Sequence, residues 1–444
     1  MNRKLLLLLG VLIMSVPSYA QREIEFTEFD LDNGLHVILH EDHSTPIVAV
    51  TVLYHVGSKN EMPGRTGFAH FFEHLLFEGS ENIDRGEFLE IVKSNGGVLN
   101  ANTTQDRTFY FELLPSNQLE LGLWLESERM LHAKIDQEGL ETQREVVKEE
   151  KRQNYDNQPY ASFRGELFSR SFTEHPYNWI PIGSLEDIKK AELSEFMDFY
   201  KTFYVPNNAT LSIAGDFDPK EAKALIAKYF SDIPKGTQEI PRPDIIEPPL
   251  TAEIVDTVYD NIQIPAVFMA YGMPGETDSD AYAMQLLTQV LSGGASARLQ
   301  SRFIDQEEMA LSVASFPYVL EDAGIFILLG LPQIGKSLDS LIIGLDEETT
   351  RVKNELITER EYEKALNQIE SSFIQSNGSM SGIAESLANY HVYYGDANLI
   401  NNEIERYRSV TREDIQRVAQ KYLDLEKRVK LIYLPKDQAQ SSAQ

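Results

Sequence analysis

Two histidines and a glutamate stand close together in an otherwise apolar stretch, "GFAHFFEHLLFEG". His70, Glu73 and His74 are spaced i, i+3 and i+4, so on an α-helix they share one face. Two neutral imidazoles one turn apart can hold one Zn²⁺, and a carboxylate beside them can take a proton from a water molecule that the ion activates. Polar groups on an apolar segment cost free energy unless they find partners. The spacing therefore favours a hydrolytic metal centre over two core histidines with satisfied hydrogen bonds.

A catalytic zinc needs a third protein ligand. The chain has no cysteine, so the candidates are His, Asp and Glu. A later acidic helix has an apolar face set by Leu140, Val146 and Val147, and at about 100° per residue Glu150 falls between the two valines. We expect Glu150 to complete the metal centre and Gln143, on the same inward face, to hydrogen-bond a ligand. The alternative is a solvated helix with Glu150 near the edge of that face.

The elements that must position these residues occur twice along the chain. One part opens with "GLHVILHEDHSTPIVAVTVLYHVGSKNE" and the other with "DNIQIPAVFMAYGMPGETDSD", each a strand pattern with a turn, followed by a helix. Both parts close with a helix, a turn and a strand. The repeat predicts an internal duplication and an α+β fold of two homologous domains, each an antiparallel sheet packed against helices. At the equivalent place, the second helix carries Met284, Gln285, Leu286 and Leu287, so packing does not require the polar group of the first.

A segment rich in Pro and polar residues, "IPKGTQEIPRPDIIEPPLTAE", divides the chain into two parts of similar length. Such composition is typical of a linker. We expect the first domain, which carries the H-x-x-E-H group, at residues 21–235 and the linker at 236–250. The second, non-zinc domain is expected at 251–436, followed by a polar tail at 437–444.

Residues 1–20 have a short basic start, an apolar run and the small-x-small sequence Ser18-Tyr19-Ala20. This pattern predicts a secretory signal peptide that is removed after Ala20. The alternative is a transmembrane anchor, but the apolar run is short for a span. No other stretch is long and apolar enough, so we expect no transmembrane anchor after cleavage. Export of a chain without cysteine suits a bacterial periplasm.

The composition limits the partners of the chain. Its 444 residues, 42% of them apolar, can form more than one core. The formal net charge of −29 excludes nucleic acid as a partner, because its phosphates would be repelled. The same charge would attract a basic peptide. Alternatively, it simply keeps an exported protein soluble.

The motifs together resemble the pitrilysin family, which includes insulin-degrading enzyme and the mitochondrial processing peptidase. The signature is H-x-x-E-H, the inverted form of the H-E-x-x-H motif, followed by a glutamate in "REVVKEE". The resemblance covers essentially the whole mature chain, and the length matches the short two-domain branch. Further similar segments are "GGVLNANTTQDRTFYFELLP", "WLESERM", "HPYNWIPIGSLEDI", "YVPNNATLSIAGDF" and "LSGGASARL".

The resemblance implies that His70, His74 and Glu150 bind one Zn²⁺ per chain. It implies that Glu73 is the general base. Several longer members carry a glutamate where this chain has Gln143, so a carboxylate role at that position does not carry over.

The resemblance also implies a mode of substrate binding. In this family two such chains, or one double-length chain, close like a clamshell around a peptide, so this chain would form one half of the clamshell. The peptide adds as a strand to a sheet edge near the zinc. Here the matching edge is "LNANTT", with Asn100 and Ala101 as the expected contacts.

One departure of this sequence from the family pattern affects which partner subunit we expect. The second half often carries an Arg and a Tyr that bind substrate and the developing oxyanion, in a segment like "LREKRGLAYSV". Here the segment is "FIDQEEMALSV", with Ile304 at the Arg position and Leu311 at the Tyr position. Such a donor is worth a few kcal/mol of transition-state stabilisation. We therefore expect a homologous, zinc-free partner subunit that supplies the pair, or else a homodimer.

The expected function is that of an exported zinc metalloendopeptidase that cuts short or unfolded peptides inside a closed chamber. One alternative is a non-catalytic scaffold or assembly subunit of the same fold. Another is a peptide-binding or maturation factor for one client, in which proteolysis is secondary. Zinc content and the effect of Glu73→Gln on turnover distinguish the three.

Overall fold

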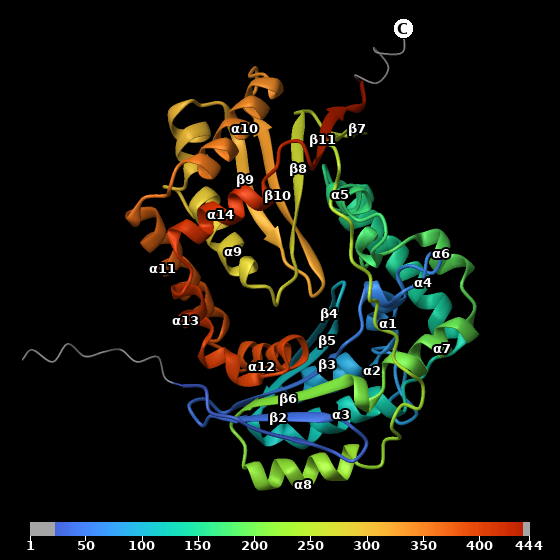
Figure 1. Cartoon of the computed structure of the whole chain (residues 1–444). Coiled ribbons are helices and arrows are strands. Elements are labelled where there is room, and N and C mark those ends of the chain that lie inside the picture. Colours follow the sequence, from blue (N-terminus) through green and yellow to red (C-terminus); the bar gives the residue numbers. More distant parts are fainter. Residues whose placement is uncertain (1–22, 438–444) are drawn as a thin grey trace, which may run out of the picture.

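The computed structural model describes residues 23–437, which form two halves built around one sheet each (Figure 1). The first half runs from blue to green in the figure and the second from yellow to red. Both halves combine a sheet with helices, so the predicted α+β fold is confirmed. The predicted signal peptide, and the predicted tail after residue 437, lie outside the described residues.

The first sheet has six strands in the order β1-β2-β6-β3-β5-β4. They are β1 (Thr27–Asp30), β2 (His36–Glu41), β3 (Ile47–Tyr54), β4 (Val98–Thr103), β5 (Thr108–Pro115) and β6 (Ala209–Gly215). The strands pair antiparallel except β2 and β6, which are parallel. β4 is an edge strand, so one row of its backbone groups is open to a further strand.

The second sheet has five strands in the order β7-β11-β8-β10-β9. They are β7 (Ile254–Asp260), β8 (Ala266–Pro274), β9 (Ala310–Tyr318), β10 (Ala323–Pro332) and β11 (Arg428–Pro435). Here β7 and β11 are the parallel pair, and the other pairs are antiparallel. With β1 set aside, this order repeats the first sheet strand for strand. The two predicted domains are thus homologous in topology.

Helices cover the sheets. In the first half they are α1 (Phe68–Leu75), α2 (Glu87–Ser94), α3 (Leu119–Leu131), α4 (Gln137–Lys151), α5 (Phe163–Ser171), α6 (Leu185–Lys190), α7 (Leu193–Phe203) and α8 (Pro219–Phe230). In the second half they are α9 (Ser279–Ser292), α10 (Leu338–Asn354), α11 (Glu359–Ser376), α12 (Met380–Tyr394), α13 (Glu403–Arg408) and α14 (Arg412–Tyr422). A π-helical segment, Arg152–Asp156, continues α4.

Both faces of the central strands are buried. Successive side chains of a strand point to opposite faces. In β3, Val50 and Val52 therefore pack against helices of the first half, whereas Ala49 and Leu53 pack toward α12 of the second half. A strand with two apolar faces must be covered twice, and here the second cover comes from the other half.

The two halves exchange helices. α12 packs on the first sheet through Ile383 and Leu387, which share a core with Ile38 of β2. In return, α5 packs on the second sheet through Leu167 and Phe168. Figure 1 shows α12 lying over β2 and β6, and α5 beside β8 and β11. The exchange makes each half part of the other's core.

A buried polar cluster also joins the halves. The Lys59 ammonium, on a side chain only 2% exposed, lies 3.0 Å from Asp106, 2.6 Å from Glu321 and 2.9 Å from Asp322. Burial alone would lower the pKa of Lys59, but the three carboxylates outweigh it and raise that pKa above its usual range. The cation therefore stays charged and ties the turn after β9 to the first half.

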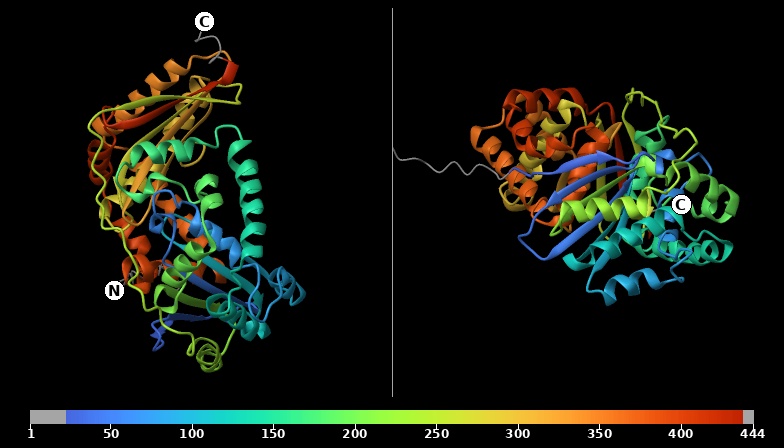
Figure 2. Two further views of the ribbon diagram at one scale, coloured as in Figure 1. Left: turned by 90° about the vertical axis from the view of Figure 1, so that its right-hand side faces the viewer. Right: turned by 90° about the horizontal axis from the view of Figure 1, so that it is seen from below.

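The connection between the halves is extended. Residues 231–253 contain no helix or strand and include the predicted linker. They run along the outside of the molecule from α8 to β7 (Figure 2). The Glu247 carboxylate holds this segment in place by accepting hydrogen bonds from the backbone N–H groups of Thr173, Glu174 and His175.

Candidate metal centre

Helix α1 presents the two histidines and Glu73 on one side and an apolar face on the other. Phe71, Phe72 and Leu75 are fully buried in the first core. The helix begins after Gly67, whose φ of 92° suits a residue without a side chain. The Glu61 carboxyl group accepts hydrogen bonds from the backbone N–H groups of Gly67 and Ala69, at 2.8 and 2.9 Å. These contacts satisfy donors that the first turn of a helix leaves free.

Glu150 comes from the last turn of α4. Leu140 and Val147 are buried on this helix, but Val146 is 43% exposed, so the inward face differs from the predicted one. It is formed by residues 140, 143, 147 and 150, the three- and four-residue spacing of a helix that packs along one seam. Both Gln143 and Glu150 belong to this seam. Glu150 is half-buried rather than solvated at the edge of the face.

Three possible ligand atoms converge between α1 and α4. Glu150 Oε2 lies 3.5 Å from His70 Nε2 and 3.2 Å from His74 Nε2. Tetrahedral zinc with bonds of about 2.1 Å keeps neighbouring ligand atoms about 3.4 Å apart. Glu150 Oε2 is also buried without a hydrogen-bond partner in the described chain. The residues therefore fit a zinc ion, and His70, His74 and Glu150 would be its protein ligands.

The two imidazoles also govern the charge of the carboxylate. His70, and then His74, hold the pKa of the Glu150 carboxyl group well below its usual range, although burial acts in the opposite direction. Two neutral imidazoles and an ionised carboxylate are the donor set that zinc prefers in the absence of cysteine.

A second group of ligand-type residues fits a metal less well. Glu28, His36 and His391 also bring possible ligand atoms within 4.8 Å of one another. The rings of His36 and His391, however, stack with centroids 3.5 Å apart and planes 2° from parallel. An imidazole binds a metal along a lone pair in its ring plane, so two stacked rings cannot both aim at one ion. The rings of His70 and His74 instead meet at 72°.

The side chain of Glu73 is held by β4. Thr103, the last residue of that strand, donates a hydrogen bond of 2.6 Å from Oγ1 to Glu73 Oε2. One carboxylate oxygen is thereby fixed, and Oε1 is left for other chemistry. No sequence motif indicates Thr103, although strand alternation places it on the same side as Ala101.

The other predicted site residues occupy different positions. Ala101 lines the cavity beside the metal centre. Asn100 is exposed on β4, and its side chain accepts a hydrogen bond from the Ala101 backbone N–H at 2.9 Å. The Gln143 amide donates to Glu78, while its Oε1 is buried and without a partner among the described residues. A contact between Gln143 and a ligand stays a prediction.

The metal centre opens into a cavity of 270 Å³ between the two halves. His70, Glu73 and Glu150 form one side of it. Besides Asn102 and Thr103 of β4, three polar side chains line it: Tyr155 from the π-helical segment, Arg164 from α5 and Tyr318 from the end of β9. Sequence reasoning missed all three, because only the folded chain brings α5 and β9 to α1.

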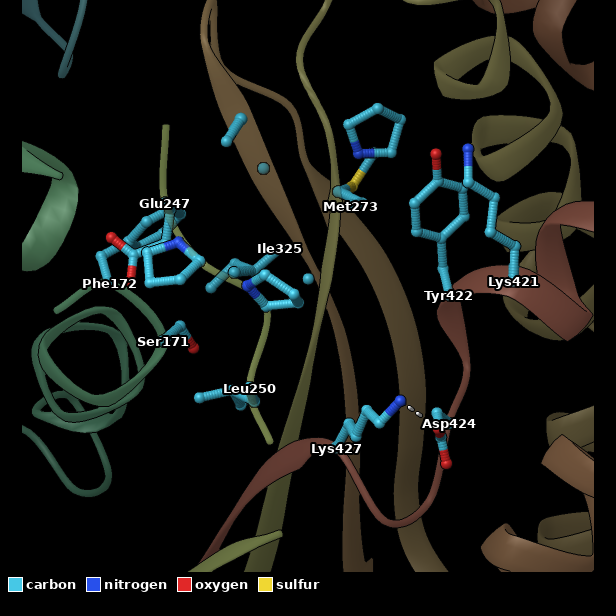
Figure 3. Close-up of a pocket in the computed structure, with 16 residues that line it drawn as sticks. Ser171, Phe172, Glu247, Leu250, Met273, Ile325, Lys421, Tyr422, Asp424 and Lys427 are labelled. Atoms are coloured by element: carbon cyan, nitrogen blue, oxygen red, sulfur yellow. Dashed lines mark ion pairs between the residues drawn. The ribbon is translucent and has the colours of Figure 1, made fainter. Parts of the chain in front are cut away.

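Another cavity, of 360 Å³, lies between the linker, the end of α5 and strands β8 and β10 (Figure 3). Its charged groups already have partners. Lys421 lies 2.8 Å from Asp280, and Lys427 lies 3.6 Å from Asp424. Glu247 binds the backbone of residues 173–175. The charged groups of this cavity are therefore paired, and the Ser171 hydroxyl in its lining is buried without a hydrogen-bond partner in the described residues.

The second half has no counterpart of the metal centre. At the place of α1 stands α9, where Met284 and Leu287 are buried and Gln285 accepts a hydrogen bond from Tyr407 at 2.8 Å. Within residues 23–437, no group of three ligand-type side chains lies in the second half alone. No helix in this range is apolar and long enough to cross a bilayer.

Comparisons with known proteins agree with these features. Residues 36–182 match the family described as insulinase, peptidase family M16, and residues 190–369 match the peptidase M16 inactive domain. The zinc protease PqqE of Helicobacter pylori is 31% identical over 415 residues, which cover 92% of each chain.

Solved structures show the same fold. A crystal structure of a protease from Helicobacter pylori has a TM-score of 0.88 and 29% identity, and the match covers 93% of this chain and all of that one. The periplasmic protease PqqL from Escherichia coli has a TM-score of 0.75 at 18% identity, and the match covers 94% of this chain but 48% of that one. Together with the H-x-x-E-H helix and its zinc-type donor set, these matches show that the chain belongs to the insulinase family of peptidases, family M16.

Proposed function

We propose that the chain is an exported, zinc-dependent metalloendopeptidase that hydrolyses peptides or unfolded segments. One observation carries the proposal: the ligand atoms of His70, His74 and Glu150 converge beside Glu73, next to the open edge of β4. The hydrolysis of a peptide bond needs a polarised carbonyl, an activated water molecule and a group that transfers one proton to the leaving amine. These residues supply sites for all three.

The roles follow from the chemistry of each group. When bound by the three ligands, one zinc ion per chain would act as a Lewis acid on the scissile carbonyl and on water. Glu73 takes a proton from the water that attacks the carbonyl carbon. It then delivers that proton to the amide nitrogen as the C–N bond breaks. The Thr103 hydroxyl keeps the Glu73 carboxylate in position through both transfers.

The proposed substrate is an extended chain. The free edge of β4 can bind a peptide as an added strand, with its backbone fixed by main-chain hydrogen bonds. Ala101 and Asn100 are the proposed contacts, since the first lines the cavity and the second is exposed on the same strand. A folded protein cannot offer a free strand, so it would be excluded.

A second unit of the same fold would close the chamber. It would be either a homologous partner subunit that brings an Arg/Tyr pair, or a second copy of this chain. Ile304 and Leu311 of this chain offer no hydrogen-bond donor in their side chains, which supports the need for a partner. The match to only 48% of PqqL leaves room in that longer chain for another unit. Light scattering on the purified chain, alone and with candidate partners, tests this point.

The proposed location is the periplasm. The predicted signal peptide at residues 1–20 supports export, and PqqL, which shares the fold, is named as a periplasmic protease. Cell fractionation with antibody detection would place the mature chain; retention of residues 1–20 in the cytoplasm would contradict export.

The function itself is tested by hydrolysis of an unfolded peptide mixture. We expect cleavage by the mature chain, or by the chain with its partner, and loss of cleavage both with a chelator and in Glu73→Gln. If added Zn²⁺ restores cleavage after the chelator treatment, the loss was due to removal of the metal and not to unfolding of the chain. A Glu73→Gln chain with full activity would defeat the peptidase proposal.

A further inference from the structure

The cavity beside the metal centre is lined by an arginine, Arg164, that pairs directly with no carboxylate among the described residues. Most arginines that the structure describes form ion pairs, such as Arg65 with Glu195 and Arg170 with Asp256. No hydrogen bond or ion pair in residues 23–437 involves the Arg164 guanidinium, which lies 5.8 Å from the ring centroid of its neighbour Phe163. The chain has 69 acidic and 40 basic side chains. An unpaired guanidinium is therefore unexpected on this chain.

The position of Arg164 is fixed by packing. Phe163, just before it, stacks on Phe268 of the second sheet, with ring centroids 4.6 Å apart. Leu167 and Phe168, further along α5, are fully buried in the same core. Arg164 lies between these anchors on the exposed side of the helix, where it lines the cavity of His70, Glu73 and Glu150.

Two tyrosines complete this side of the cavity. Tyr318, the last residue of β9, packs edge-on against Phe168 with centroids 5.0 Å apart. Tyr155 lies in the π-helical segment that follows the ligand helix α4, and such segments are frequent at functional sites. Neither hydroxyl has a hydrogen-bond partner in residues 23–437. Together with the Arg164 guanidinium, the cavity lining therefore has three donor groups without a partner among these residues. Burial raises the pKa of Tyr155, while the nearby Arg164 charge acts against the rise.

The lining of the cavity thus combines acceptors with donors. It includes the Glu73 and Glu150 carboxylates, the Arg164 guanidinium and the phenol groups of Tyr155 and Tyr318. A guanidinium with neighbouring hydroxyl donors is suited to bind a carboxylate, through hydrogen bonds strengthened by charge. A neutral backbone carbonyl would form weaker hydrogen bonds with these donors, because it carries no negative charge.

We propose that Arg164, together with the hydroxyl groups of Tyr155 and Tyr318, forms a subsite for a carboxylate of the peptide substrate beside the bond that is cut. This rests on the proposed peptidase function. The carboxylate belongs either to an Asp or Glu side chain or to the C-terminus of the peptide. The net charge of −29 repels acidic peptides at long range, so any preference for them must arise from such a local contact.

Peptide binding to the zinc-loaded Glu73→Gln chain tests the subsite without hydrolysis. The probes are one short labelled peptide in which Glu or Gln stands at successive positions, each with a free or amidated C-terminus. Fluorescence anisotropy gives the dissociation constants. At one position we expect Glu to bind about tenfold tighter than Gln, the value of a charged hydrogen-bonded pair. If the free C-terminus gives the gain instead, the terminus is the carboxylate that binds.

Each matched variant carries one further substitution in the Glu73→Gln chain. Arg164→Gln should abolish the preference while peptides with Gln bind as before, and Arg164→Lys should keep part of it. Arg360→Gln removes an equally unpaired arginine from a different cavity and should change nothing. Equal loss for Glu and Gln peptides in Arg164→Gln, or no carboxylate preference in the starting chain, would overturn the subsite.

The peptidase proposal and the subsite proposal can be contradicted independently of each other. Binding with a carboxylate preference but no cleavage by the wild-type chain, with or without a partner, would leave the subsite and remove the peptidase. Cleavage of all peptides without regard to a carboxylate would leave the peptidase and remove the subsite.

Discussion

Helices α1 and α9 hold equivalent places in two sheets of the same strand order, yet only α1 carries residues that could bind a metal ion. α9 fills its place with Met284, Leu286 and Leu287, all buried. The frame is therefore stable with apolar residues at this helix, and the polar group of α1 is an addition to it. The halves also differ at their junction, where Lys59 follows β3 and Glu276 follows β8. The proposed chemistry thus falls to α1, while α9 serves packing.

The largest effect should follow from the chemical difference between the helices. Glu73→Gln should lower the turnover of an unfolded peptide about a thousandfold, because a positioned general base is lost. Metal content, measured by mass spectrometry of the purified chain, should not change. Gln285→Glu in α9 is the matched control, since it alters the same functional groups in the second half without a metal centre. Activity lost equally in both variants would contradict the assignment of chemistry to α1.

The exchanged helices should be equally important to both halves. Leu387→Ala in α12 and Leu167→Ala in α5 each remove a fully buried side chain, and each should lower the free energy of unfolding by roughly 3 to 4 kcal/mol. Urea unfolding followed by tryptophan fluorescence and circular dichroism should show one transition in both variants. Ile374→Ala, at a position 57% exposed, is the control. Two separate transitions in either variant would mean that the halves fold independently.

The junction should give the second half a pH dependence of its own. Burial, with the charges of Asp106 and Glu321, raises the pKa of Glu276 to about 7. A raised folded-state pKa contributes stability below the unfolded value of about 4.5, and this contribution is lost as the pH rises through about 7. Glu276→Gln should thus be the more stable chain at pH 8.5, by up to about 3 kcal/mol, and lose that advantage near pH 4.5. Urea unfolding at several pH values measures the difference in unfolding free energy between the two chains. A difference that does not change with pH would contradict this prediction.

The smallest effect concerns the contact between β4 and helix α1. Thr103→Val removes the hydrogen bond to Glu73 but keeps the shape of the side chain, so kcat should fall about tenfold with little change in KM. Thr103→Ser, which keeps the hydroxyl group, should retain most activity. Steady-state kinetics on one peptide separate the two constants. A change in KM alone would assign Thr103 to substrate binding.

The sequence predicted those parts of the site that depend on local periodicity. The spacing of His70, Glu73 and His74 placed them on one helical face, and the repeat of elements predicted two homologous α+β domains. Glu150 emerged from the helical period of α4, although Val146 proved exposed rather than part of the inward face. Its convergence with the two histidines needed the fold.

The remaining groups have no local signal. Thr103 is one threonine among several on an edge strand, and its role depends on the approach of β4 to α1. Arg164 and Tyr318 belong to different halves and meet the metal centre only because α5 crosses to the second sheet. Contacts of this kind follow from tertiary packing, which composition and periodicity do not encode.

The exchange of α5 and α12 has a consequence for proteolysis and for evolution. A protease that nicks the extended linker would leave two fragments bound to each other, because each still holds a helix in the other's core. Split genes for the two halves could complement one another for the same reason. After the ancestral duplication, neither copy could leave without exposing its partner's apolar sheet face. This mutual dependence would keep the second half in the chain although it has no ligand group of its own.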